Sequence, residues 1–398
     1  MENVIFIISK DALSKDALPI YNNKYWKTPN IDALAKQGTV FHRHYTAAPS
    51  TAMAFTSMFT GMYAHQTGRK DYTEVAETDK ASNAESLFDF LDGHGYKCHL
   101  LWSQNYIHMA ERFSKCFGKN TVHHDKLDLN QFVGAHIKGL TGSVTRDDSI
   151  VEENYGKLME EINSIDTSSP VFLWVHLPHV LKGRECYGGD IDLLDRFVGD
   201  IRNKFGDQIT ITADHGSGNG KDGITGYGFH LYESQICIPL ITPKIQNVSE
   251  IHFPTSNTQL TEILFSHSVS QKDYVISDTA YYQQPHRKLA IVQGNYKYIY
   301  EKQTKTEHLY DVVNDPEENL DLHKTVMHDK ERNRNVVTRQ VLFYHDWDKA
   351  EEEFVKLRAI KDSIWKDGTL WERIKYGSWR MVFYNFRRKI KSIQHAFK

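Results

Sequence analysis

The sequence predicts an α/β protein: a three-layer sandwich with a mostly parallel central sheet, a small C-terminal antiparallel subdomain and a helical tail. Three observations carry this prediction. Short apolar, β-branched runs alternate with amphipathic helical segments in the first part of the chain. From about Tyr274 the pattern changes to strands separated by tight turns. From about Val326 it becomes helical and rich in charged and aromatic residues.

Buried strands and helices alternate along the first part. Val4–Ile8 is a continuous apolar run, typical of a strand buried on both faces. Asn30–Gln37 predicts a helix that Pro29 opens and Gly38 ends. The same criteria predict helices at Ala52–Phe59 (ended by Gly61), Ala84–Leu91 (closed by Gly93), Ile150–Ile162 and Ile191–Asn203, and strands at Lys97–Trp102, Val171–Val175 and Gln208–Thr212.

The second part predicts a small antiparallel sheet and a basic tail. Its strands are Tyr274–Tyr282, Lys288–Val292 and Lys297–Tyr300, and Gly294 with Asn295 forms one of the turns. Between Arg373 and Lys398 there are eight Lys or Arg, no acidic residue and several aromatics. Such a segment either packs its aromatics on the main domain or makes a peripheral contact with an anionic membrane.

The composition excludes several classes of protein. The chain has 398 residues, of which 40% are hydrophobic and 25% charged, so it is not disordered, collagen-like or a disulfide mini-scaffold. The net charge of −3 gives no global field for nucleic acid, and no nucleic-acid partner is expected. We expect a large α/β domain at 1–270, a small antiparallel-sheet subdomain at 271–325 and a basic, aromatic helical tail at 326–398.

The start of the chain and the cysteines indicate a compartment. Met1 is followed almost directly by Val4–Ile8, without a basic region or a small-residue cleavage site. That run is far shorter than the roughly 20 residues of a spanning helix. The four cysteines lie far apart and form no CxxC, which predicts reduced, mostly buried thiols. These features predict a cytoplasmic protein, membrane-associated if the tail makes the contact described above.

Polar residues follow the predicted strands where ligands bind in parallel sheets. Asp11 comes after the first strand, and Asp214 with His215 follows Gln208–Thr212. Thr51 lies in a turn that enters a helix. Two carboxylates and an imidazole suit Zn²⁺ or Mn²⁺, and a hydroxyl at a helix N-terminus is well placed to attack an anion. Each feature alone is also explained by a helix cap or a turn; their arrival together favours a metal site with a nucleophile.

Several motifs in order resemble the sulfatase branch of the alkaline phosphatase superfamily, from Asn3 to about Leu320. Thr28–Phe41 is very close to the signature "TPNxDxLAxxGxxF", and Thr212–Gly216 reads "TxDHG". The other resembling segments are Asn3–Asp11, Thr60–Gly68, Phe172–His179, Gly228–Ile241 and Tyr310–Leu320. The resemblance implies the three-layer fold of that superfamily, with residues 1–270 as a sulfatase-like catalytic domain.

This chain departs from the sulfatase pattern at the anion site. Thr51 stands where sulfatases place the cysteine that becomes formylglycine, and the "CxPxR" signature reads Thr51–Phe55. The "GKWH" element falls at Trp102–Asn105, without its lysine and histidine. Lys10 replaces the first of the paired aspartates that bind calcium in sulfatases. The resemblance then implies that Lys10 contacts the substrate anion or points elsewhere.

The remaining set is similar to lipoteichoic acid synthase and the lipid A phosphoethanolamine transferases. These enzymes use an acidic residue, a threonine nucleophile, an aspartate and a histidine around Mn²⁺ or Zn²⁺. Residue by residue, the resemblance implies Asp11, Thr51, Asp214 and His215 as metal ligands, with Thr51 also the nucleophile. The first ligand in that branch is usually Glu rather than Asp. We expect one divalent ion, Zn²⁺ or Mn²⁺ first, with Ca²⁺ or Mg²⁺ as alternatives.

Several histidines lie outside this set. The resemblance implies that His179 contacts the anion or protonates the leaving group, as a catalytic residue. His176 and His230 are expected to bind substrate, with a structural role for the first and a surface position for the second as the alternatives. Four histidines without a motif are read as surface or loop residues: His42, His44, His123 and His124.

The function expected from this set is metal-dependent phosphotransfer. A phospho-donor would pass a substituted phosphate, phosphoethanolamine- or phosphoglycerol-like, through a covalent phospho-Thr51 to a glycan or glycolipid acceptor. The alternatives are hydrolysis of a phosphodiester or phosphonate ester, and sulfatase-like hydrolysis of a sulfuric ester, against which the missing cysteine argues. A non-catalytic glycan-binding role is disfavoured because Asp11 and Asp214 are retained. Ser50, one residue before the nucleophile position, is expected to cap the helix.

Overall fold

The structure is a computed structural model of the chain. It describes residues 3–67, 85–102, 117–124, 135–138, 143–146, 148–178, 184–219, 225–266, 268–279, 287–323, 326–329, 334–337 and 346–365.

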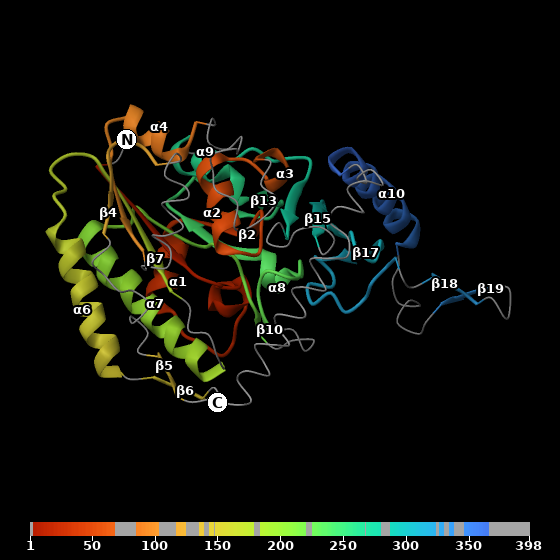
Figure 1. Cartoon of the computed structure of the whole chain (residues 1–398), viewed down its shortest axis with the longest axis horizontal. Helices are drawn as coiled ribbons and strands as arrows, with labels where there is room; N and C mark the ends of the chain where they lie inside the picture. The colour runs from red at the N-terminus through yellow and green to blue at the C-terminus, as the bar shows by residue number, and fades with distance from the viewer. Residues whose placement is uncertain are drawn as a thin grey trace, which may run out of the picture.

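A central sheet of nine strands, counted over the described residues, organises the molecule (Figure 1). The strand order is β12-β2-β11-β8-β1-β7-β3-β4, with β13 also paired to β2. The strands from β8 to β4 are mutually parallel, whereas β11 runs antiparallel to both its neighbours. The bounds are β1 Val4–Lys10, β2 Thr39–Tyr45, β3 Lys97–Leu101, β4 Thr121–His123, β7 Val171–Leu177, β8 Ile209–Ala213, β11 Cys237–Thr242, β12 Glu250–Ile251 and β13 Thr255–Ser256. The predicted mostly parallel sheet is confirmed.

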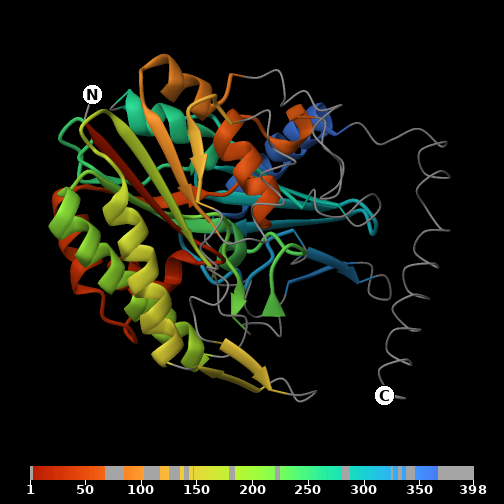
Figure 2. The ribbon, with the colours of Figure 1, turned by 60° about the vertical axis from the view of Figure 1, so that its left-hand side comes forward.

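Helices cover both faces of this sheet, which gives the predicted sandwich (Figure 2). α7 packs with α1 and α6 on one face, where the ring of Tyr155 in α6 meets Phe197 in α7. On the other face α2 packs with α4 and α9, and its Phe55 and Phe59 lie against Trp174 of β7. The bounds are α1 Pro29–Gln37, α2 Thr51–Thr60, α3 Ala64–Thr67, α4 Leu87–Gly93, α6 Asp148–Ser164, α7 Arg184–Phe205, α8 Glu233–Ile236 and α9 Leu260–Phe265.

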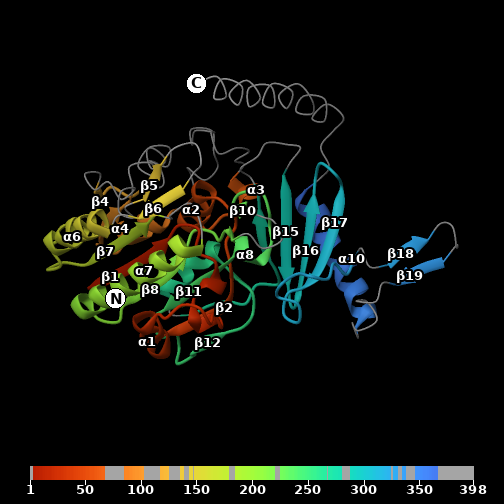
Figure 3. The same ribbon diagram turned by 90° about the horizontal axis from the view of Figure 1, so that it is seen from below.

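The second sheet has four antiparallel strands in the order β14-β15-β16-β17. It lies between the central sheet and α10 (Trp347–Ile364), as Figure 3 shows. Val275 and Val292 face Tyr45 and Ile236 of the large domain, whereas Tyr298 packs against α10. The strands are β14 Val275–Asp278, β15 Lys288–Gln293, β16 Tyr296–Glu301 and β17 Thr306–Asp311. The three predicted strands are present, and β17 is an additional one.

The prediction of a continuous helical segment from Val326 is wrong. Val326–Asp329 (β18) pairs with Arg334–Val337 (β19) in an antiparallel hairpin, and the helix begins only at Trp347. β-Branched valines in both strands favour extended backbone. The basic segment Arg373–Lys398 lies outside the described residues, and its membrane contact stays a prediction.

Smaller elements complete the chain. Short hairpins pair β5 with β6 and β9 with β10. Their bounds are Ala135–Lys138, Ser143–Arg146, Gly218–Asn219 and Thr225–Gly226, and short 3-10 helices lie at Lys15–Ala17, Pro19–Tyr21 and Asn257–Gln259. α4 starts at Leu87 because Ser86 closes a capping box with Asp89. Cys98 and Cys237 are free, buried thiols, as predicted. A search of the described helices for an apolar stretch of membrane-spanning length found none.

Candidate active site

The carboxyl ends of β1, β7 and β8 lie side by side and carry the site. Lys10, the last residue of β1, is in register with Leu177 of β7 and with Ala213 of β8. The residues that follow, Asp11 and Asp214, therefore leave the sheet at the same edge. The Asp11 N–H donates to the Leu177 carbonyl at 2.9 Å, which continues the ladder by one residue.

Asp214 and His215 are held rigidly in the loop after β8. One carboxylate oxygen of Asp214, Oδ1, accepts hydrogen bonds from the N–H groups of Ala12 (3.1 Å) and His215 (2.8 Å). The His215 ring places Nδ1 2.8 Å from the carbonyl of Gly216, and the Tyr227 ring lies 4.4 Å from it, centroid to centroid. Because a carbonyl only accepts, Nδ1 carries the proton and Nε2 presents its lone pair.

That lone pair faces the predicted nucleophile. The Oγ1 atom of Thr51 lies 3.2 Å from His215 Nε2. Thr51 is the first residue of α2, and Ser50 precedes it with extended backbone. The first N–H groups of an α-helix have no partner inside the helix and favour anions. The hydroxyl, the imidazole and the helix N-terminus therefore converge on one point.

The three other predicted ligands meet beside Thr51. His215 Nε2 lies 3.4 Å from Asp214 Oδ2 and 3.7 Å from Asp11 Oδ1, and ligand atoms of all three residues lie within 4.8 Å of one another. Asp214 Oδ2 is buried and has no hydrogen-bond partner among the described residues. Two buried carboxylates facing one imidazole need a positive charge to offset their desolvation. The donor set therefore fits a divalent cation.

His176 lies directly behind the cluster. Its Nδ1 is 2.8 Å from the Ser9 hydroxyl, which accepts a hydrogen bond from the Trp174 indole at 2.7 Å. Its Nε2 is 3.9 Å from Asp214 Oδ2. Burial lowers the pKa of His176, although Asp214 and Asp11 act in the opposite direction. At 3.9 Å the ring makes no hydrogen bond to the Asp214 carboxylate, and substrate contact by His176 stays a prediction.

The structure brings Lys10 to a partner that sequence reasoning missed. Its ammonium lies 3.1 Å from Asp190 Oδ2 in α7 and donates to the Pro178 carbonyl. Both side chains of this ion pair are buried. No spacing signal links residues 180 positions apart, so only the fold could reveal the pair. The ammonium thus neutralises Asp190, and contact of Lys10 with a substrate anion stays a prediction.

His230 is not part of the cluster that Asp11, Asp214 and His215 form. His230 stacks on Tyr232 at 5.8 Å, and burial and Lys288 of the small sheet lower its pKa, partly offset by Glu301. His179 lies outside the described residues, so its catalytic role stays a prediction. Of the histidines expected on the surface or in loops, His44 is fully buried in β2 and bonded to Thr255, which corrects that expectation.

Fold and site together define an α/β protein of the alkaline phosphatase-like superfamily. Residues 2–267 match the family model described as "Sulfatase". The chain therefore belongs to the sulfatase family, a family of metal-dependent hydrolases.

Similar proteins carry the same family name. An arylsulfatase of Clostridium perfringens is 35% identical over 88 residues, 22% of this chain and 18% of that protein. Arylsulfatase D of Homo sapiens is 28% identical over 121 residues, 28% of this chain and 20% of that protein. The matched segments thus span about a fifth of these relatives' own length.

Solved structures share the fold over nearly the whole chain. A 2-O GAG sulfatase has a TM-score of 0.66 at 14% identity, covering 90% of this chain and 91% of that one. The phosphonate monoester hydrolase of Agrobacterium radiobacter has a TM-score of 0.64 at 13% identity, covering 90% and 96%. At such identities the likeness is one of fold.

Proposed function

We propose that this chain is a metal-dependent hydrolase of phosphodiesters or phosphonate esters, with Thr51 as the attacking residue. One observation carries the proposal. The Thr51 hydroxyl lies at the N-terminus of α2, 3.2 Å from the unprotonated nitrogen of His215. Thr51 cannot become formylglycine, because that residue derives from cysteine in the sulfatases this chain resembles. A threonine hydroxyl can instead form a phosphoester with an electrophilic phosphorus.

The proposed reaction has two balanced steps. In the first, the Thr51 oxygen forms a bond to phosphorus and the bond from phosphorus to the ester oxygen breaks. The alcohol leaves with one proton, equivalent to the proton lost by Thr51. In the second, water cleaves the bond between Thr51 and phosphorus, which releases the phosphorus acid and restores the hydroxyl.

The other site residues support these steps from fixed positions. Asp11, Asp214 and His215 would hold the cation, which when bound lowers the pKa of a neighbouring hydroxyl and stabilises charge on phosphoryl oxygens. The N-terminus of α2 offers N–H groups to the same oxygens. The N–H groups of Ala12 and His215 keep the Asp214 carboxylate in place.

Transfer rather than hydrolysis would use the same intermediate. If a glycan or glycolipid hydroxyl replaced water in the second step, the product would be the phospho-modified acceptor expected from the sequence. The family relatives and structural neighbours named above are hydrolases, and for that reason water is the acceptor in our proposal.

The test compares ester classes and Thr51 variants. The protein, supplied with Zn²⁺ or Mn²⁺, is incubated with bis(p-nitrophenyl) phosphate, p-nitrophenyl phenylphosphonate and p-nitrophenyl sulfate. We expect turnover of the phosphorus esters and an adduct on Thr51 in quenched samples analysed by peptide mass spectrometry. Thr51→Val keeps the shape of the side chain but should lower kcat/KM by at least about 10³-fold and abolish the adduct.

Thr51→Ser is the matched control, because it retains the hydroxyl and should retain adduct formation. Turnover of the sulfate ester that survives Thr51→Val would refute both the substrate class and the nucleophile. A sugar alcohol can also be added as an acceptor. If its phosphorylated form accumulates while the hydrolysis product decreases, the result favours transfer.

A further inference from the structure

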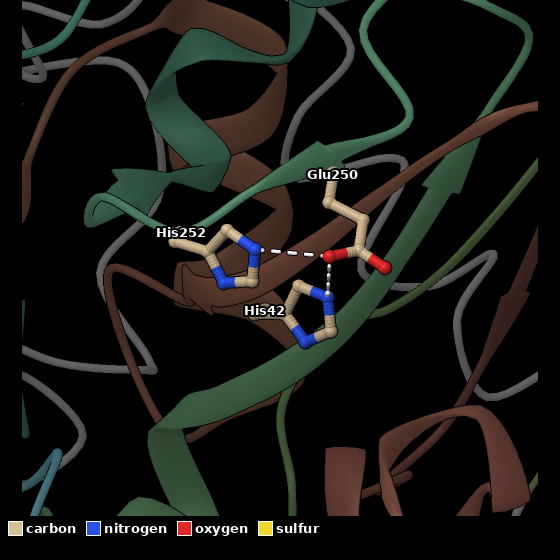
Figure 4. Close-up of side chains that lie close together, drawn as sticks. All are labelled: His42, Glu250 and His252. Atoms are coloured by element: carbon tan, nitrogen blue, oxygen red, sulfur yellow. Dashed lines mark hydrogen bonds and ion pairs between the residues drawn. The ribbon is translucent and has the colours of Figure 1, made fainter.

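A second group of metal-ligating side chains lies at the edge of the central sheet, outside the site described above. It consists of His42, Glu250 and His252 (Figure 4). The edge strand β12 pairs in parallel with β2, with Glu250 opposite Val40. Because side chains alternate along a strand, Glu250 and the residue two positions later project from the same face as Val40 and His42. The pairing of these two strands therefore builds the group.

The two imidazole rings converge on one carboxylate oxygen. Glu250 Oε2 lies 3.0 Å from His252 Nε2 and 3.6 Å from His42 Nε2. Tetrahedral zinc with bonds of 2.0–2.1 Å separates its ligand atoms by about 3.3–3.4 Å, so the two measured separations bracket that value. The rings are stacked at 4.4 Å, and His252, whose side chain is 67% exposed, is the ring free to turn toward a shared ion.

His42 faces the Glu250 carboxylate without a hydrogen bond to it. Burial, His252 and Lys15 lower the pKa of His42, against the opposing effect of Glu250. His42 Nε2 is buried and has no hydrogen-bond partner among the described residues, since 3.6 Å to Glu250 is too long for a hydrogen bond. A cation between the nitrogen and the carboxylate would satisfy both.

We propose that His42, Glu250 and His252 form a second metal site that binds a divalent transition-metal ion such as Zn²⁺. Two imidazole nitrogens and one carboxylate oxygen are ligands that Zn²⁺ takes, and a water molecule completes the tetrahedron. The residues of the catalytic cluster are not shared with this site. The proposal therefore stands or falls independently of the proposed hydrolase activity.

A metal ion bound at this site would cross-link β2 and β12 at the edge of the sheet. β12 has two residues, and the chain near it is attached to β2 by hydrogen bonds such as Val40 N–H to the Ser249 carbonyl at 2.9 Å. A metal ion held by both strands would add a cross-link there. Binding to the folded state alone raises stability by mass action, so the thermal midpoint should rise with Zn²⁺.

The test uses the full chain, stripped of metal by a chelator, and Zn²⁺ as the only added ion. Equilibrium dialysis should find two bound ions in the wild type and one in His252→Ala. Glu250→Gln should weaken the second ion at least about tenfold. Both side chains are largely exposed, so these variants fold. His94→Ala, which removes an exposed histidine after α4, is the matched control and should bind two ions.

A second readout locates the ion. Zn²⁺ should slow amide hydrogen exchange in the peptides that contain β2 and β12 in the wild type and in Asp214→Asn, which lacks a ligand of the catalytic cluster. The same slowing should be absent from His252→Ala. If His252→Ala and Glu250→Gln bind as many Zn²⁺ ions as the wild type with equal affinity, or if β12 exchanges equally with and without Zn²⁺, the proposal is wrong.

Discussion

At the residue scale, His215 determines what the Thr51 hydroxyl can do. The Gly216 carbonyl fixes the proton on Nδ1, and the Tyr227 ring covers the imidazole. Nε2 is therefore the ring atom that faces Thr51 and can bind a cation. A threonine elsewhere on α2, such as Thr56, instead bonds to a backbone carbonyl of its own helix. The difference between these two hydroxyls is one of surroundings.

Ser50 behaves differently from the expected helix cap. It occupies the N-cap position by its backbone, but its side chain makes no capping hydrogen bond. Its Oγ is buried and has no hydrogen-bond partner among the described residues. The sequence predicts a loss of at most about 1–2 kcal/mol of stability for Ser50→Ala through the missing cap. The structure predicts instead a change between zero and about 1 kcal/mol of added stability, because an unsatisfied buried hydroxyl is removed.

Urea unfolding of Ser50→Ala measures this directly. Ser86→Ala in α4 is the comparison, since Ser86 accepts from the Asp89 N–H and should lose about 1 kcal/mol. Equal destabilisation of the two variants would mean that Ser50 caps α2 in solution.

The predicted cluster could be read from the sequence because each member follows a recognisable local pattern. Asp11 and Asp214 directly follow strands whose apolar runs are unambiguous, and the position of Thr51 is fixed by its distance from Gly61, a helix end with φ of 65°. The partner of Lys10 could not be read, because Asp190 belongs to a helix with no local link to β1. Local patterns predict positions at element ends but not pairings between distant elements.

At the element scale, the loop after β8 depends on close contact with α8. Gly216 donates its N–H to the Gln235 carbonyl at 2.8 Å. A Cβ on Gly216 would lie 2.1 Å from the Ser234 carbonyl oxygen. Because displacing the Ser234 backbone costs energy, the loop that carries Asp214 and His215 would have to move. The glycine is therefore required by space and not by its backbone angle.

Gly216→Ala should lower both stability and activity. We expect a loss of about 1–3 kcal/mol in the free energy of unfolding from overpacking, and a fall in kcat/KM because His215 shifts relative to Thr51. Gly93→Ala is the control: nothing lies within 4 Å of its added Cβ, so both quantities should stay near wild type. Denaturant unfolding measures the free energy of unfolding, and the phosphoester assay measures kcat/KM. Wild-type values of both for Gly216→Ala would contradict the close contact.

Element prediction succeeded where periodicity was strong and failed where strands were amphipathic or short. β1, β7 and β8 are continuous apolar runs, and the sequence placed each within two residues of its observed ends. β2 contains His42, Arg43 and His44 in its middle. These polar residues interrupt the apolar pattern by which a strand is predicted from sequence. The sequence pattern predicts helix in place of the hairpin β18–β19, because its short strands lie beside a long charged segment. Tertiary pairing decides such segments.

At the scale of the whole molecule, one buried ionic group joins the two sheets. Lys297 of β16 lies 3.0 Å from Glu233 of α8 and 2.7 Å from Glu318. The Glu233 N–H also donates to the Glu318 carboxylate at 2.6 Å. Glu318 has a φ of 55°, a strained value for a residue with a side chain, which these contacts hold in place. The site-bearing domain is thus fastened to the small sheet by charge as well as by apolar contact.

One ammonium cannot fully neutralise two buried carboxylates. Lys297, Lys15 and Arg43 lower the pKa of Glu233 although burial raises it. Burial raises the pKa of Glu318 from 4.5 to about 7, against the attraction of Lys297. Near neutral pH Glu318 therefore still binds a proton in part of the molecules, whereas Glu233 is ionised.

This proton makes the junction between the sheets sensitive to pH. Because folded Glu318 binds its proton more tightly than the unfolded chain does, its contribution to stability is complete below pH 4.5 and is lost as pH rises through about 7.

Glu318→Gln keeps the shape of the side chain and cannot ionise. Between about pH 5 and about pH 8.5 the wild type should therefore lose up to about 3 kcal/mol of unfolding free energy relative to Glu318→Gln. Glu317→Gln, at the exposed neighbouring position, should follow the wild type. Denaturant unfolding at both pH values gives the answer: parallel pH profiles for wild type and Glu318→Gln would mean that Glu318 stays ionised in the folded protein and that Lys297 neutralises both carboxylates.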